Sequence, residues 1–584
     1  MKKLLSIFAT LAFAGTLMAD LTVENKVADF TALASLYAKQ YAPANWKIQA
    51  LGVNIFNISP WLEKVRATKN DVEYLEVCAQ YVSSFQDGHT QFYAPGNFIA
   101  DMGIIVDLWD DKVLIEAIDR VNLPASRFPF VVGDQLISVD GKPVADLVAG
   151  FAKNHTYANP RYTQRLAVDQ LTFRWQPEVA AAGLLGDTAT IEVLLASTSK
   201  VETYTIKWQK DGTPITKFAP MPGFFGREPI RGRESDLPAN NGDTTVPLWQ
   251  QYIDSKVVRA RTEKRDALRK GLWINEETGE LHPRREYTGY GSNRPVWVFP
   301  SGFVIRLGRS SSDFITTGTY NSDGQRIGYL RIGQFGSLST AQLNQLDAEI
   351  NFFNSNTDGL VVDIMRNPGG FGCNMVEMTR RLMPSVFTHF SLQLRPLFSD
   401  ISDYDDYIST LESLGAPASL VDLYRAERQV ILDTWSNGRG MTGAIPACYF
   451  DLNVSPTATS YKKPMILLVD DFSTSAADIM SAMIQDNGRA KLVGYRTSGA
   501  GGSVIDIAGG PFAESETTMT NSLIMRAKDY EYPGFPKSPY IENVGVRPDV
   551  DLDYQTRDNL MNRGKTFVDS FTKIMVDTIR SGGK

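Results

Sequence analysis

The sequence predicts a multidomain α/β protein with a helical N-terminal domain, a β-rich domain and an α/β core that contains a mostly parallel sheet. Three observations support this fold class. The chain has 584 residues, which exceeds one ordinary hydrophobic core. Helical spacing of apolar residues dominates the first hundred residues, and β-rich runs follow. From Arg326 onward, buried-strand runs alternate with helical stripes, which is typical of a parallel sheet covered by helices on both faces.

The N-terminus has the pattern of a signal peptide. Lys2 and Lys3 precede an apolar run from Leu4 to Met18, and Ala19 supplies a small residue for cleavage. We therefore expect residues 1–19 to be removed and the mature protein to be exported, to the periplasm or the extracellular space. The run is short for a transmembrane span, and no later stretch reaches about 18 apolar residues, so no stable membrane insertion is expected.

Charge and metal-binding residue types exclude several function classes. A formal net charge of -7 gives no electrostatic basis for nucleic-acid binding. Three cysteines are too few, and odd in number, for a disulfide framework, and their spacing matches no zinc pattern. The chain has four histidines and no His-Glu-x-x-His string, so neither a metal nor another cofactor is predicted.

Residues 20–98 are expected to form the helical N-terminal domain. Apolar residues keep helical spacing in two stretches, Val27 to Tyr37 and Val72 to Val82. The second stretch leads into an Asp87-Gly88 turn, which presents His89 on a loop.

The next two segments differ in composition. Residues 99–210 carry β-rich runs separated by turns at Asp110-Asp111 and Asp140-Gly141. Residues 211–322 are an insertion or linker with Pro/Gly clusters and a basic helical stretch, Lys256 to Lys270. We hypothesise that this insert covers a cleft; a lid, a self-inhibitory segment and a docking surface remain open as its role.

Residues 323–584 form the predicted α/β core. Four strands are expected, at Ile327–Ile332, Gly359–Ile364, Pro464–Asp470 and Ala490–Gly494. The stretch after the third strand, Phe472 to Met480, is the most informative part of the chain. Apolar residues at helical spacing begin at Ala476, so Ser475 lies on the turn between a buried strand and a helix.

Two interpretations of this turn stand side by side. A helix N-terminus favours negative charge, so it would stabilise an alkoxide or the oxyanion of an acyl tetrahedral intermediate. Ser475 with Asp478 is equally a capping box that only begins the helix. The string Asn367-Pro-Gly369-Gly370 follows the preceding strand, and its backbone N–H groups, with that of Ala476, could form an oxyanion hole.

Five segments in order make the region from residue 326 to about 554 resemble the tail-specific, or C-terminal processing, serine peptidases. They are Ile327–Ile332, Val361–Gly370, Phe472–Asp478, Gln485–Gly494 and Glu542–Asp549. Residues 99–208 resemble that family's PDZ module, most clearly at Val132–Val144. The resemblance implies protein or peptide substrates, and a PDZ domain captures peptide C-termini with backbone amides, here around Gly103, Ile104 and Ile105.

One departure from the family pattern bears on the mechanism. The commoner branch uses a Ser–Lys dyad with lysine in a Thr-x-Gly-Lys-Gly string, but this chain has Ala500 in the lysine position. The tricorn-like branch uses serine, histidine and glutamate, with the last two in Asp-Gly-His and Glu-Asn-x-Gly-Val-x-Pro-Asp strings. Both strings occur here, and they imply Ser475 as nucleophile, His89 as general base and Glu542 as its orienting partner.

The alternative function is a non-catalytic binding or carrier protein on the same fold, because fold alone does not fix function. A metal-dependent or elbow-type hydrolase is disfavoured, since the chain has no Gly-x-Ser-x-Gly string and no metal-ligand spacing. Cleavage preference and oligomeric state are left open.

Overall fold

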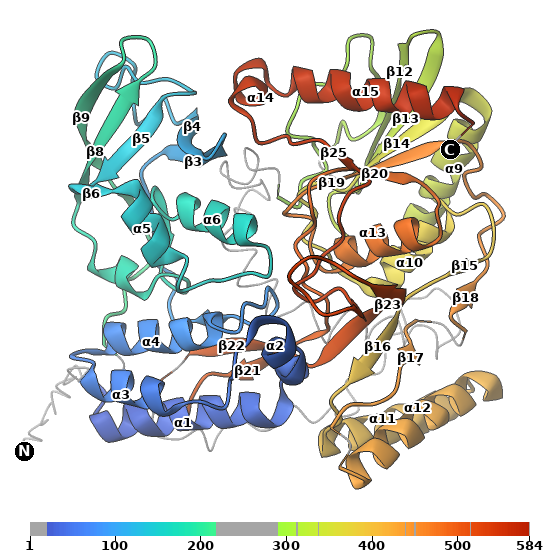
Figure 1. Ribbon diagram of the computed structural model, residues 1–584, viewed down its shortest axis with the longest axis horizontal. Coiled ribbons are helices and arrows are strands. Elements are labelled where there is room, and N and C mark those ends of the chain that lie inside the picture. The colour runs from blue at the N-terminus through green and yellow to red at the C-terminus, as the bar shows by residue number, and fades with distance from the viewer. Residues whose placement is uncertain are drawn as a thin grey trace, which may run out of the picture.

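The computed structural model describes residues 20–217 and 290–582, apart from 311, 312, 337, 439, 449, 450 and 514. The predicted signal peptide and the basic stretch Lys256 to Lys270 lie outside these residues. The β-rich domain and the N-terminal helices lie on one side of the molecule and the α/β core on the other (Figure 1).

A seven-stranded sheet forms the α/β core of the described chain. Its spatial order is β11 (Val304–Leu307), β12 (Thr316–Ser322), β13 (Gln325–Arg331), β14 (Gly359–Asp363), β19 (Met465–Val469), β20 (Lys491–Gly494) and β25 (Val550–Asp551). Strands β13 to β25 pair in parallel, whereas β11, β12 and β13 are antiparallel neighbours. The sheet is therefore mixed. The predicted parallel arrangement is limited to β13 through β25, because a tight turn at Asp323-Gly324, both with positive φ, reverses the chain between β12 and β13.

Helices cover both faces of this sheet (Figure 1). On one face lie α9 (Thr340–Asn356), α10 (Gly372–Arg380) and α13 (Ala476–Asp486), and on the other lies α15 (Lys565–Arg580). Successive residues of β19 alternate between these layers: Leu467 packs in the α13 layer and Leu468 in the α15 layer. Burial on both faces explains why β14 and β19 are uninterrupted apolar runs.

The β-rich domain is built on a second sheet. Its main strand order is β3 (Ile104–Trp109), β4 (Lys112–Ile118), β5 (Gln135–Val139), β8 (Thr188–Leu195) and β9 (Lys200–Lys207), with β6 (Lys142–Pro143) beside β5. Two helices, α5 (Val144–Phe151) and α6 (Pro160–Asp169), pack on it, and α6 lies beside the edge strand β3. A smaller sheet of β2 (Ile99–Asp101), β7 (Phe173–Trp175) and β10 (Gln209–Asp211) and the 3₁₀ helix Ala180–Leu184 complete the domain.

The N-terminal helices share their core with the C-terminal half of the chain. They are α1 (Val23–Gln40), α2 (Ala44–Leu51), α3 (Ser59–Ala67) and α4 (Asp71–Ser83). The strand after them, β1 (Phe92–Tyr93), pairs with β22 (Glu516–Thr520), which pairs in turn with β21 (Val504–Ala508). Met519 is buried among the apolar side chains of α1 and α4. The segment predicted as a separate helical domain is thus completed by residues more than 400 positions away.

The remaining elements lie around the core. A four-stranded antiparallel sheet has the order β17 (Ile445–Pro446), β16 (Ser391–Leu394), β23 (Ser522–Tyr530) and β24 (Ser538–Tyr540). The other elements are the hairpin α11 (Phe398–Ser413) and α12 (Ala418–Ser436), the strand pair β15 (Phe387–Thr388) and β18 (Asn453–Val454), and α14 (Arg557–Asn562).

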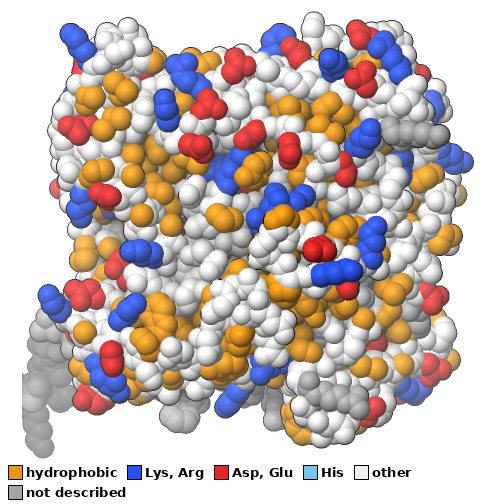
Figure 2. Space-filling view, in the orientation of Figure 1, with side chains coloured by type: hydrophobic (Ala, Val, Ile, Leu, Met, Phe, Trp, Pro, Cys, Tyr) orange, Lys and Arg blue, Asp and Glu red, His pale blue; other side chains and the backbone are white. Residues whose placement is uncertain are grey.

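One disulfide, Cys373–Cys448, joins the start of α10 to the residues after β17. The sequence did not predict this bond, because the two cysteines are 75 residues apart and only the fold brings them together. Among the described residues, no helix combines the length and apolar character needed to cross a bilayer. Figure 2 shows acidic and basic side chains interspersed over one face of the molecule.

Candidate functional site

Ser475 lies between β19 and α13 in a backbone conformation that side chains rarely adopt, with φ 59° and ψ -117°. Such a conformation costs about 1–3 kcal/mol and persists only where the surroundings hold it. Here the N–H of Thr474 donates to the carbonyl of Asn367 at 2.9 Å, and Ser473 Oγ donates to the carbonyl of Ile364 at 3.0 Å. These bonds fix the half-buried Ser475 at the carboxyl end of the parallel strands, where ligands of α/β sheets bind.

Asp478 ties this turn to a second loop, Thr497–Gly501. Its carboxylate accepts hydrogen bonds from the backbone N–H groups of Ser475 (2.9 Å), Gly499 (2.9 Å) and Ala500 (3.2 Å). Burial raises the pKa of Asp478 to about 6, although these amides favour the ionised form. One of the two hydrogen bonds of the predicted capping box, from the N–H of Ser475 to the carboxylate of Asp478, is therefore present. The same carboxylate also anchors the loop that carries Ala500.

The glycine loop after β14 lies directly against Ser475. A Cβ atom on Gly369, which has φ 92°, would lie 2.6 Å from Ser475 Cβ and 2.9 Å from the backbone nitrogen of Ala476. Only glycine fits there. The N–H of Gly369 donates to Asn367 Oδ1 at 2.8 Å, so that amide is already engaged.

The other two amides of the predicted oxyanion hole are oriented differently. Gly370 and Phe335 form a parallel β-bridge. The N–H of Phe335 donates to the carbonyl of Gly369, and the N–H of Phe371 donates to the carbonyl of Phe335, so the N–H of Gly370 itself points away from Phe335. Ala476 is the first residue of α13, where an N–H has no intrahelical acceptor. Gly370 and Ala476 are therefore the better candidates for the oxyanion hole, and Gly369 provides the close approach.

Glu542 is fully buried in the turn after β24. One carboxylate oxygen pairs with the ammonium of Lys47, and the other accepts from the N–H of Gly501 at 3.0 Å. Burial and the nearby charge of Asp87 raise the pKa of Glu542 to about 7, although Lys47 and the Gly501 amide act in the opposite direction.

His89 lies in the turn that follows α4, and its side chain is buried. Asp87 holds this turn, because its carboxylate accepts from the N–H of His89 at 2.8 Å and from the hydroxyl of Tyr41 at 2.8 Å. Gly88 packs on the Thr497–Gly501 loop: a Cβ atom there would lie 3.1 Å from Ala500 Cβ. The strings that carry Ser475, His89 and Glu542 all contact this one loop.

Two residues of the site were given no functional role in the sequence analysis. Asp478 was visible only as a helix cap, and Lys47 had no signal at all. Lys47 lies in an ordinary helical segment, and its partner Glu542 is 495 residues away. No local pattern can reveal such a pair.

The predicted peptide-binding residues lie at the start of the edge strand β3. Gly103 has φ 74°, and its N–H donates to Asp101 Oδ1 at 2.7 Å. Ile104 and Ile105 pair with Ile118 and Ala117 of β4.

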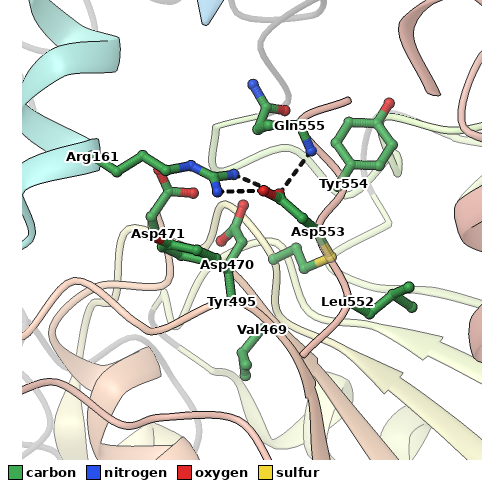
Figure 3. Close-up of a pocket in the computed structure, with 10 residues that line it drawn as sticks. Arg161, Val469, Asp470, Asp471, Tyr495, Leu552, Asp553, Tyr554 and Gln555 are labelled. Atoms are coloured by element: carbon green, nitrogen blue, oxygen red, sulfur yellow. Dashed lines mark hydrogen bonds and ion pairs between the residues drawn. The ribbon is translucent and has the colours of Figure 1, made fainter. Parts of the chain in front are cut away.

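The far end of β3 is joined to the α/β core. The N–H of Asp110 donates to the carbonyl of Gln555 at 3.1 Å. Arg165 of α6 is buried between Asp107 of β3 (2.6 Å) and Asp471 of the core (2.9 Å). Arg161 of the same helix reaches Asp553 at 2.6 Å (Figure 3). Because Asp471 precedes the turn of Ser475 by only a few residues, the β-rich domain is anchored next to that turn.

Comparison with known proteins agrees with this architecture. Residues 326–552 match peptidase family S41, and residues 100–215 match a PDZ domain. A protein of Chlamydia trachomatis is 24% identical over 602 aligned positions, covering 97% of this chain and 94% of that protein. A chloroplastic C-terminal processing peptidase of Tetradesmus obliquus is 25% identical over 231 positions, 39% of this chain and 36% of that protein.

Solved structures show the same fold. Mature CPAF superimposes with a TM-score of 0.71 at 20% identity, covering 96% of this chain and 99% of that chain. A CPAF mutant gives a TM-score of 0.72 with the same identity and coverage. The matches, together with the segments quoted from the sequence, show that the chain belongs to peptidase family S41, the tail-specific serine peptidases, and carries a PDZ domain.

Proposed function

We propose that this serine peptidase is exported and hydrolyses peptide bonds in protein or peptide substrates through Ser475, His89 and Glu542. One observation carries the proposal: the nucleophile turn, the His89 turn and the Glu542 turn all contact the Thr497–Gly501 loop, although they come from distant parts of the chain. A carrier protein has no reason to keep a serine, a histidine and a glutamate on three turns that contact one loop, beside a strained serine backbone.

The roles follow from the chemistry of each group. Ser475 Oγ attacks the substrate carbonyl, and His89 accepts the hydroxyl proton and returns it to the leaving amine. Glu542 stabilises the imidazolium that forms. The N–H groups of Gly370 and Ala476 stabilise the oxyanion, and removing one such donor typically slows catalysis about 100- to 1000-fold. Water then hydrolyses the acyl-enzyme by the same route in reverse.

A fluorophosphonate probe tests the nucleophile. We expect the mature protein to be labelled and Ser475→Ala to lose the label without unfolding, whereas Ser570→Ala, on the surface of α15, keeps it. Labelling that survives in Ser475→Ala would identify a different nucleophile. A folded wild-type protein that takes no label and cleaves no peptide in a library would favour the carrier function.

His155 offers a matched control for His89, because both side chains are 5% exposed. The ring of His155 is held by Gln91 Oε1 at 2.9 Å and by the carbonyl of Glu178 at 2.8 Å, which is a structural arrangement. We expect His89→Ala to lower kcat by orders of magnitude with little change in melting temperature. His155→Ala should instead lower the melting temperature and keep the activity of the folded fraction.

Two further parts of the proposal have separate tests. Export with removal of residues 1–19 predicts that the secreted protein begins at Asp20, which N-terminal sequencing checks. Binding of peptide C-termini at Gly103–Ile105 stays a prediction, and it requires the Gly103 amide to leave Asp101. Fluorescence anisotropy should then show weaker binding of peptides whose C-terminal carboxylate is amidated.

A further inference from the structure

Lys47 is fully buried in α2, and its ammonium forms an ion pair with the equally buried Glu542. We propose that Lys47 is a positioning residue for the peptidase reaction, which favours the ionised form of Glu542 and joins the turn of His89 to the turn of Glu542. This inference rests on the functions proposed for His89 and Glu542. Ala500 stands where the commoner branch of the family has its catalytic lysine, and the role inferred for Lys47 differs from the role of that lysine.

All three N–H bonds of the Lys47 ammonium have acceptors, and these come from both turns. Besides Glu542, they are Asn543 Oδ1 at 2.7 Å and the carbonyl of Gln86 at 3.1 Å. Asn543 Nδ2 also donates to that carbonyl at 2.7 Å. One side chain from α2 therefore fastens together two turns that are more than 450 residues apart.

Both turns need such support because each contains a strained residue. Gln86 has φ 52° and Asn543 has φ 63°, a region that non-glycine residues enter only where neighbouring contacts hold them. Lys47 contacts both of them, in addition to the bond from the N–H of Asn543 to the carbonyl of Gly499 (2.9 Å) and the bond from Asn543 Nδ2 to the carbonyl of Gln86. A loss of the ammonium would loosen both the turn that leads into His89 and the turn that carries Glu542.

The charges around Glu542 give Lys47 a second task. The groups that act on this carboxylate are Lys47 of α2, Asp87 of the turn after α4, Tyr41 and the N–H of Gly501, and His89 in turn lies next to Asp87. Two buried carboxylates share one ammonium. Without that ammonium, burial and the repulsion of Asp87 would act on Glu542 with only one amide opposing them, so the pKa would rise further and the protonated form would predominate at neutral pH. A neutral carboxyl group stabilises an imidazolium far less than a carboxylate does.

Substitution of a lysine with a purely structural role should have different effects, and Lys26 provides the comparison. Lys26 is also buried and pairs with Asp71 at 3.2 Å, between α1 and α4, in contacts that do not include the site. Removing either lysine leaves a buried carboxylate without its partner and should lower the melting temperature. Only the removal of Lys47 should alter the pH dependence of catalysis.

The experiment measures kcat and KM for a peptide substrate across pH 5–9 in wild type, Lys47→Met, Lys47→Gln and Lys26→Met. We expect both Lys47 variants to lower kcat at pH 7 by at least about 10-fold, with KM within about 2-fold, and to shift the acid limb of kcat/KM upward by about one pH unit or more. The labelling rate of Ser475 should fall in parallel. Lys26→Met should keep the wild-type pH profile. Lys47→Gln retains two N–H donors, so it keeps the inference testable if Lys47→Met does not fold.

A double-mutant cycle separates this inference from the proposed function. If Lys47 acts through Glu542, the Lys47→Met/Glu542→Gln protein is no slower than Glu542→Gln alone. A folded Lys47 variant with the wild-type acid limb, beside an inactive Glu542→Gln, overturns the role of Lys47 and leaves the triad intact. Full activity of Glu542→Gln overturns the triad itself.

Discussion

Asp478 gives the sharpest test of how the nucleophile turn is held, because three backbone amides depend on its carboxylate. Asp478→Ala removes all three hydrogen bonds and leaves the amides of Gly499 and Ala500 buried without an acceptor, while that of Ser475 is partly accessible. A buried unsatisfied amide costs about 1–3 kcal/mol, so we expect the free energy of unfolding to fall by about 3–5 kcal/mol. Asp478→Asn keeps one oxygen acceptor and should lose only about 1–2 kcal/mol.

The assay combines urea denaturation with the labelling rate of Ser475 by a fluorophosphonate. The exposed acid Asp506 on β21 is the control, and Asp506→Ala should leave both measurements unchanged. We expect labelling to slow in the order wild type, Asp478→Asn, Asp478→Ala, since the strained Ser475 backbone relaxes as its anchor weakens. A midpoint and a labelling rate of Asp478→Ala equal to those of wild type would refute this account of the turn.

Three other changes probe the site. Gly369→Ala places a methyl group 2.6 Å from Ser475 Cβ, so we expect labelling to be lost in a protein that circular dichroism shows to be folded; normal labelling would contradict the close approach. Arg165→Met removes the guanidinium that two buried carboxylates share between the PDZ domain and the core, and leaves Asp471 only the longer contact with Arg161 (3.5 Å), so it should lower the free energy of unfolding by about 3–5 kcal/mol, as urea denaturation measures. In the wild type, kcat/KM should rise with pH through an acid limb near 7, because the pKa of Glu542 is raised to about 7 and only its ionised form, present above that pH, stabilises the imidazolium. An acid limb near 4.5 would show that Glu542 titrates as an exposed carboxyl does.

The parallel strands were predictable from sequence because burial on both faces leaves no polar interruption. The apolar runs around residues 359–364 and 464–470 correspond to β14 and β19, and the helical spacing that begins at Ala476 corresponds to α13. Ser475 is found between them, as the change from strand to helix spacing predicted. The antiparallel edge of the sheet was not predicted, since β11 is half exposed and β12, although mostly buried, consists largely of Thr and Gly and carries no comparable apolar run.

The site was predictable only where a local string marks it. The Asp-Gly-His and Glu-Asn-x-Gly strings pointed to His89 and Glu542 through the family resemblance, and their catalytic roles stay predictions. Lys47 belongs to no string, because its function depends on contacts made in the folded state with residues from two other segments. Long-range ion pairs of this kind are fixed by tertiary structure, and a periodicity analysis has no access to them.

The arrangement of the chain also explains why a peptidase core alone would be an incomplete site. Residues 323–584 supply Ser475 and Glu542, but the imidazole comes from the turn after α4 and the ammonium from α2. Strand β22 of the core pairs with β1, and Met519 is buried only because α1 and α4 cover it. The N-terminal segment therefore brings an imidazole and an ammonium to the candidate site, and its helices cover an apolar surface of the core in the same packing. Assembly of the candidate site and burial of that surface are coupled, so Ser475 gains the partners proposed for it only when both ends of the chain have folded together.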